Sequence, residues 1–101
     1  MPYVRQTSVK RKLQEVQGRI VALRSDIAVL DEQIEVLDEE VESLQVRAVV
    51  SETPLAIKEH AEASRHAGLA HRAREAAQRQ LAELEQQRDE LLGEIIAEVT
   101  T

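Results

Sequence analysis

The sequence predicts an all-α protein in which two long helices fold back on each other as an antiparallel coiled-coil hairpin. An apolar residue recurs at alternating spacings of four and three from Val9 to Ala48, which is the repeat of a coiled coil. The 101 residues include one aromatic residue, three glycines and two prolines, so there is little material for turns or for a core of packed rings. The strongest break, around Pro54, lies near the middle of the chain and would join two helices of similar length.

The first predicted helix runs from about Ser8 to about Val49. Residues 1–7 are expected to form a polar arm, because Pro2 disfavours helix there and Thr7 or Ser8 would serve as the N-cap. The apolar repeat that marks this helix never slips over more than five heptads, so it fixes which side of the helix is covered. Its positions are Val9, Leu13, Val16, Ile20, Leu23, Ile27, Leu30, Ile34, Leu37, Val41, Leu44 and Ala48.

The second predicted helix runs from about Pro54 to about Val99, after a turn over residues 50–53. Thr53 is a favourable N-cap, and Pro54 is favourable at the first helical position. Two helices joined by so short a loop pack antiparallel, so residues 8–101 should form a single domain. The covered positions of this helix are expected to be Ala56, His60, Ala63, Ala67, Ala70, Arg74, Ala77, Leu81, Leu84, Arg88, Leu91 and Ile95.

The charges agree with this folding back. Residues 1–25 carry six basic and one acidic side chain, whereas residues 81–101 carry one basic and six acidic ones. Residues 26–52 carry one basic and nine acidic side chains, against five basic and three acidic in residues 53–80. A hairpin places each acidic stretch beside a more basic one, which favours one direction and register. The expected partners are Arg65, Arg72, Arg74 and Arg79 on one helix and Asp26, Asp31, Glu35 and Asp38 on the other.

Apolar residues outside the repeat predict a second contact surface. Val21, Val29 and Val36 on the first helix and Leu69 on the second would stay in water in a hairpin of two helices. We expect them to form an interface, most simply with a second copy in a homodimeric four-helix bundle. Two alternatives stay open. The residues are ordinary scattered surface residues, or the first helix pairs in parallel with the same helix of another chain while the second helix folds over the outside.

The sequence offers no chemistry-bearing motif that would predict an enzyme. There is no cysteine, no nucleophile elbow and no phosphate-cradling glycine loop. His60, His66 and His71 lie in one stretch of the second helix, but they do not follow the spacing of known zinc or di-iron sites. We therefore expect no catalytic residues, no metal and no cofactor.

The expected function is that of a non-enzymatic protein–protein interaction module, an adaptor, scaffold or assembly factor that pairs with itself, with another protein or with both. Residues 1–12 lack the apolar stretch of a secretory signal, and no apolar run reaches the roughly 18 residues of a membrane span. We therefore expect a cytoplasmic protein without a membrane partner, and the Ala-, Arg-, Glu- and Val-rich composition suggests a GC-rich bacterium or phage. The exposed turn is expected to be a partner contact made by Val49, Val50, Ser51, Glu52, Thr53, Pro54 and Leu55.

The alternative function is a regulator that binds the transcription machinery or nucleic acid through the hairpin tip or the N-terminal arm. Phosphate contacts in that case would come from Arg5, Lys10, Arg11 and Lys12. The net charge of -6 disfavours nucleic acid as a partner. The dense run of acidic side chains from Asp31 to Glu42 has two interpretations. It is either a solvated face that pairs with the arginines of the second helix or a contact surface for a basic partner.

Overall fold

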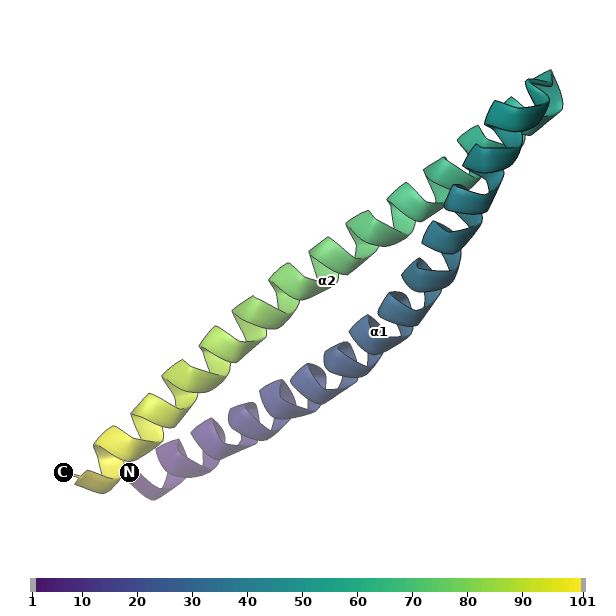
Figure 1. Cartoon of the computed structure of the whole chain (residues 1–101). Helices are drawn as coiled ribbons and strands as arrows, with labels where there is room; N and C mark the ends of the chain where they lie inside the picture. Colours follow the sequence, from purple (N-terminus) through teal and green to yellow (C-terminus); the bar gives the residue numbers. More distant parts are fainter. Residues whose placement is uncertain (1, 101) are drawn as a thin grey trace. The chain divides into compact units, whose positions relative to one another are not determined.

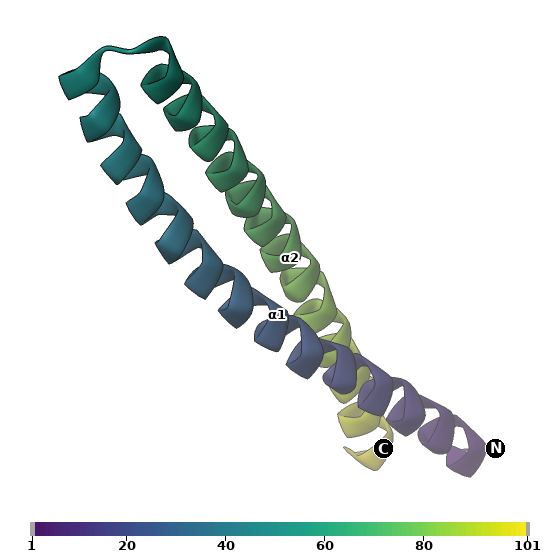
Figure 2. The same ribbon diagram turned by 90° about the vertical axis from the view of Figure 1, so that its right-hand side faces the viewer.

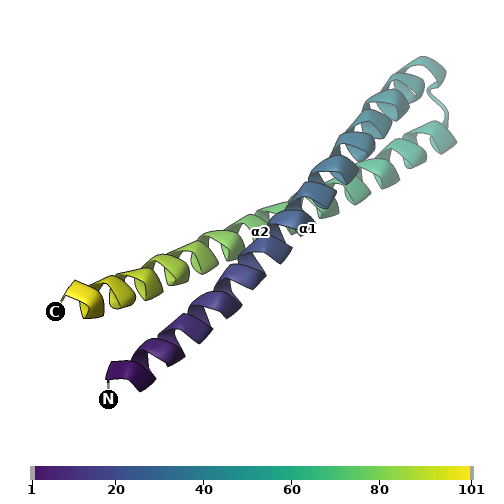
Figure 3. The same ribbon diagram turned by 90° about the horizontal axis from the view of Figure 1, so that it is seen from below.

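The structure, a computed structural model, describes the backbone of residues 2–100 and the side chains of residues 7–100. Helix α1 spans Pro2–Ser51 and helix α2 spans Pro54–Thr100, and the chain reverses between them (Figure 1). No strand occurs among residues 2–100, so the predictions of an all-α fold and of a helical hairpin are confirmed. Both helices are continuous ribbons from end to end (Figure 3).

Helix α1 begins at Pro2, earlier than the expected start at Ser8. Residues 2–7, predicted as a polar arm, are therefore part of the helix. The physical reason is that proline is tolerated in the first turn of a helix, where its missing N–H would have no partner and its fixed φ is already helical. No other proline and no glycine follows before Gly18, so nothing in residues 3–17 interrupts the helix.

The turn consists of Glu52 and Thr53, because Val50 and Ser51, predicted to lie in the turn, complete the last turn of α1. Glu52 has a φ of 50°, the left-handed conformation that commonly ends a helix. The side-chain oxygen of Thr53 accepts a hydrogen bond from the backbone N–H of Ala56 at 3.2 Å. Thr53 is thus the N-cap of α2, as predicted, and the connection between the helices is visible in Figure 2.

The helices contribute to two compact units, one made of Ile27–Ala76 and the other of Met1–Asp26 with Ala77–Thr101. In the unit 27–76, every predicted repeat position is buried or half-buried, and the same holds for the described repeat positions of the other unit. The positions that the repeat assigned to the inside of the hairpin are therefore the ones that the helices cover. The fully or nearly fully buried apolar residues are Val9, Val16, Ile20, Ile27, Ile34, Ala56, Ala63, Ala67, Leu81 and Leu84.

The two units differ in what α2 offers to α1. In the unit 1–26 with 77–101, α2 supplies Leu81 and Leu84, and Ile20 of α1 is 0 % exposed. In the unit 27–76, α2 supplies alanines such as Ala63 and Ala67. Alanine covers little of a large neighbour, and the leucines of α1 in this unit stay half-buried. The packing of unit 27–76 therefore leaves apolar surface open.

Neither helix, over the described residues, has a stretch apolar and long enough to cross a membrane.

Candidate interaction surface of the unit 27–76

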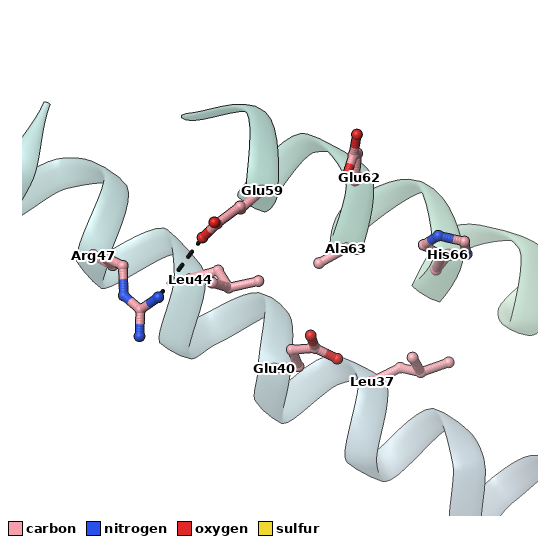
Figure 4. Close-up of a pocket in the computed structure, with 8 residues that line it drawn as sticks. All are labelled: Leu37, Glu40, Leu44, Arg47, Glu59, Glu62, Ala63 and His66. Carbon is pink, nitrogen blue, oxygen red and sulfur yellow. Dashed lines mark ion pairs between the residues drawn. The ribbon is translucent and has the colours of Figure 1, made fainter. Parts of the chain in front are cut away.

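A groove opens on one side of the unit 27–76, close to the turn (Figure 4). Its volume is about 400 Å³. Leu37 and Leu44 of α1 and Ala63 of α2 form its apolar part. The groove exists because the alanine side chain is too short to cover the leucines that α1 presents at the same level.

Charged and polar side chains surround the apolar part of the groove. They are Glu40 and Arg47 of α1 and Glu59, Glu62 and His66 of α2. Nη1 of Arg47 lies 3.6 Å from Oε2 of Glu59 across the groove (Figure 4). The Arg47 side chain is largely in solvent and that of Glu59 is partly exposed, so the pair contributes about 1 kcal/mol or less. Three carboxylates against one guanidinium give this rim an acidic character.

The apolar surface continues along the same side of the unit, away from the turn. On α1, Leu37 is shared with a second, shallower apolar depression that Glu32, Gln33 and Val36 also line. On α2, Leu69, Ala73 and Ala76 follow His66 at spacings of three and four residues, so they share its side of the helix. We call this surface the groove face. Besides the eight residues that line the groove, it comprises Val29, Gln33 and Val36 of α1 and Leu69, Ala73 and Ala76 of α2.

The groove face exposes large apolar side chains. Val29 is 50 % exposed, Val36 is 64 % exposed and Leu69 is 48 % exposed. Farther from the turn than Glu40 and His66, none of the residues of the groove face is charged. They are Val29, Gln33, Val36, Leu37, Leu69, Ala73 and Ala76. Apolar side chains gathered on one side of a small unit are typical of a surface that another protein covers.

The opposite side of the unit carries two further ion pairs between the helices. Nε2 of His71 lies 3.0 Å from Oδ1 and 3.1 Å from Oδ2 of Asp38. The Nε–H group of Arg74 donates a hydrogen bond to Oδ1 of Asp31. This hydrogen bond, together with the charge of Asp31, raises the pKa of Arg74. Away from the turn, this side of the unit is therefore charged, whereas the groove face there is apolar.

Some of the predicted ion pairs between the helices are present in the structure. Arg74 pairs with Asp31 as expected, but Asp38 is met by His71 rather than by an arginine. In the other unit Nη2 of Arg24 lies 3.5 Å from Oε2 of Glu85. Arg24, Asp31 and Asp38 are seven residues apart, so they occupy the same heptad position, next to the apolar repeat. The pairs thus line one side of the helix contact and fix its register.

Three of the four residues predicted to form an oligomer interface belong to the groove face, namely Val29, Val36 and Leu69. Val21 is 58 % exposed but lies in the other unit. Its position in the heptad is one earlier than that of Val29 and Val36, so its side chain leaves α1 on the side of the ion pairs. Its part in an interface remains a prediction.

The turn is an exposed apolar region. All seven residues from Val49 to Leu55 are exposed, and Val50 has 79 % of its surface in water. Val46 and Ile57, which the sequence did not single out, add to this region at 64 % and 55 % exposure. The signal that would have found them is their position, because both lie outside the apolar repeat and next to the turn.

The basic residues near the N-terminus whose side chains the structure describes are exposed, and one of them lies among acidic side chains. Arg5 lies outside the described side chains, while Lys10, Arg11 and Lys12 are exposed. Lys12 lines a groove of the unit 1–26 with 77–101 together with three glutamates, Glu15, Glu90 and Glu94. A phosphate group placed beside Lys12 would therefore also meet negative charge.

The three histidines do not form a metal site. His60 is half-buried at a repeat position, His66 lines the groove and His71 contacts Asp38. Over the described residues there is no group of three or more side chains that could hold a metal ion.

Comparisons of this chain with protein-family models, with curated proteins and with solved structures gave no match.

Proposed function

We propose that the protein is a non-enzymatic interaction module, an adaptor, scaffold or assembly factor of the cytoplasm, whose helices pack as a coiled coil and which pairs with a second copy of itself. The observation that supports this most directly is the groove face, where half-covered leucines and exposed Val29, Val36 and Leu69 gather on one side. Fully burying one such side chain is worth about 1.5–3 kcal/mol. Two helices alone leave most of that free energy unused, whereas a four-helix arrangement recovers it.

Sedimentation equilibrium over a wide concentration range tests this proposal. One chain has a mass of 11.4 kDa, and a dimer should appear at twice that value. The double variant Val29→Glu and Val36→Glu places two carboxylates on the groove face and should return the mass to that of one chain. Val49→Glu is the matched control, because Val49 is as exposed as Val36 but its heptad position places it on the side of the ion pairs. A wild-type mass of one chain at all concentrations would refute self-association.

The second candidate function is that of a regulator that binds the transcription machinery or nucleic acid. The exposed apolar turn around Val50 and Leu55 supports a protein contact there, and exposed Lys10, Arg11 and Lys12 support a phosphate contact. A pull-down with the purified chain that retained RNA polymerase or nucleic acid would favour this function over the first. Loss of that binding on deleting residues 1–12 would assign it to the basic segment, and its persistence would assign it to the turn.

A further inference from the structure

We infer that the groove face is covered by a second copy related by a two-fold axis parallel to the helices of the unit 27–76, so that α1 of each copy packs against α2 of the other. The inference rests on the proposed self-association and adds the geometry of the contact. Four observations carry it: the heights of residues in the unit, the apolar residues at matching heights, the charges beside them, and the charge of each helix segment.

The ion pair between Asp31 and Arg74 and the residues that face each other across the groove indicate which residues of α1 and α2 lie at similar heights. Asp31 is paired with Arg74. Val36 follows Asp31 by five residues and Leu69 precedes Arg74 by five, so this pair places Val36 level with Leu69, since both helices rise by about 1.5 Å per residue. The contact between Asp38 and His71 places Val36 level with Ala73, so Val36 lies beside the segment of α2 from Leu69 to Ala73.

Two further pairs of residues are level by the same reasoning. Val29 precedes Asp31 by two residues and Ala76 follows Arg74 by two, so these residues share a height. Near the turn, the contact between Arg47 and Glu59 brings Val50 to within one residue of the height of Leu55. All six residues occupy one position of the heptad repeat, at the outer edge of the groove face.

A two-fold axis parallel to the helices keeps every height and exchanges the two helices. It therefore brings Val36 opposite Leu69 of the second copy, Val29 opposite Ala76, and Val50 opposite Leu55. Each of these contacts is apolar on both sides, and each occurs twice in the dimer. The half-buried Leu37 and Leu44, which line the groove, would then face the middle of the four-helix bundle.

Under the same operation the charged residues of the groove face come opposite polar or oppositely charged residues of the second copy, with Glu62 opposite Ser43. Glu40 comes opposite His66 of the second copy, and Arg47 comes opposite Glu59. At the outer flank, Glu32 comes within about one residue of the height of Arg72 of the second copy, and Glu39 within about one of Arg65. Arg47 with Glu59 and the two pairs at the outer flank thus place unlike charges opposite each other, which favours this partner and register over others.

The charges of the helix segments disfavour the other face-to-face arrangement, in which a two-fold axis across the helices would lay α1 on α1. Residues 27–51 of α1 carry seven acidic side chains and one basic side chain. Residues 54–76 of α2 carry four basic and three acidic side chains. Contact between two α1 segments would bring two strongly acidic surfaces together, while contact between α1 and α2 would not.

Single cysteines test the geometry, because the chain contains no cysteine of its own. The variants Val36→Cys and Leu69→Cys are prepared separately, mixed in equal amounts and treated with a short bismaleimide. The mixture should give covalent dimers in up to half of the molecules, whereas each variant alone should give none. A mixture of Val46→Cys with Leu69→Cys is the control and should stay uncross-linked. Circular dichroism of each variant checks that the helices are intact.

The outcomes separate the geometry from self-association. Cross-linking of Val36→Cys with itself would overturn the inference in favour of a contact between the two α1 helices. A dimeric mass without any cross-link in the mixture would also overturn it, while leaving the proposed function standing. A mass of one chain for the wild type would refute both.

Charge reversal gives a second test that needs no cross-linking. Glu32→Arg places two arginines at each flank, and Arg72→Glu places two carboxylates there, so either single variant should raise the Kd of the dimer by roughly twofold to tenfold. The double variant exchanges the charges and should bring the Kd back toward that of the wild type. Failure of the double variant to recover any affinity would count against the proposed contact.

Discussion

The backbone N–H of Glu52 donates a hydrogen bond to the carbonyl oxygen of Ala48 at 3.0 Å. This bond closes the C-terminus of α1 with Glu52 in the left-handed conformation, at a φ of 50°, and it satisfies a carbonyl group that the helix leaves without a partner. Glycine is the usual residue at such a position, because a Cβ atom crowds the neighbouring carbonyl oxygen there.

Replacing Glu52 by glycine should therefore stabilise the protein. Relief of the left-handed strain favours the folded state, and the greater freedom of glycine in the unfolded chain offsets part of that gain, so we expect a net increase of about 0.5–1 kcal/mol. Urea unfolding followed by circular dichroism measures it. Ser51→Gly is the control, because Ser51 is the last helical residue and glycine should destabilise it. If Glu52→Gly were the less stable of the two, the account of the turn would be wrong.

The fold could be predicted from the sequence because the interior of a two-helix hairpin depends on spacing alone. The positions counted from Val9 to Ala48 are the positions that α2 covers. The start of α1 could not be placed, because Pro2 is compatible both with an arm and with a first helical turn. The groove face could not be recognised either. It depends on which residues of α1 lie at the same height and on the same side as which residues of α2. The prediction grouped Val21 with Val29 and Val36, although Val21 lies one heptad position earlier and therefore on another side of α1.

Truncating Ile20 should produce the largest loss of stability among single substitutions in the core. Ile20 is 0 % exposed, and no other large side chain described is so fully buried, so Ile20→Ala should cost about 2–5 kcal/mol. Ile96→Ala is a matched control in the same unit, since Ile96 is 61 % exposed, and it should change stability by about 0.5 kcal/mol or less. Equal losses for the two variants in thermal unfolding would mean that the repeat does not define the core.

Exchanging the charges of Asp31 and Arg74 tests whether their pair fixes the register of the unit 27–76. Asp31→Arg or Arg74→Asp alone should lower the Tm through like-charge repulsion, and the double variant should recover part of the loss. The raised pKa of Arg74, caused first by its hydrogen bond to Asp31, means that this contribution is fully present below the ordinary pKa of an arginine side chain and is lost only as the pH rises through the raised pKa. The coupling between the two residues should therefore be the same at pH 7 and pH 9, and a coupling that vanished between these pH values would contradict this account.

Gly18 offers a stabilising substitution within α1. It lies in the helix interior, and a Cβ atom added there would meet nothing within 4 Å. Alanine is favoured over glycine in a helix by about 0.8–1 kcal/mol, so Gly18→Ala should raise the free energy of unfolding by about that amount. The same change at Gly93, which is equally open, should add to the first. An unchanged or lowered stability would indicate that residue 18 contacts another surface, which a sedimentation measurement on the same variant would reveal.

Enlarging Ala67 tests whether the alanines of α2 set the spacing of the helices in the unit 27–76. Ala67 is 5 % exposed against α1, and a leucine there would need space that the packed helices do not offer. We expect Ala67→Leu to destabilise the unit by about 1–3 kcal/mol, although leucine itself is a good helix former. Ala61→Leu is the control, because Ala61 is exposed outside the groove face and the change there should be nearly neutral. If Ala67→Leu raised the stability instead, α1 and α2 would have room between them, and the half-covered leucines of the groove would owe their exposure to a loose contact rather than to the shortness of the alanines.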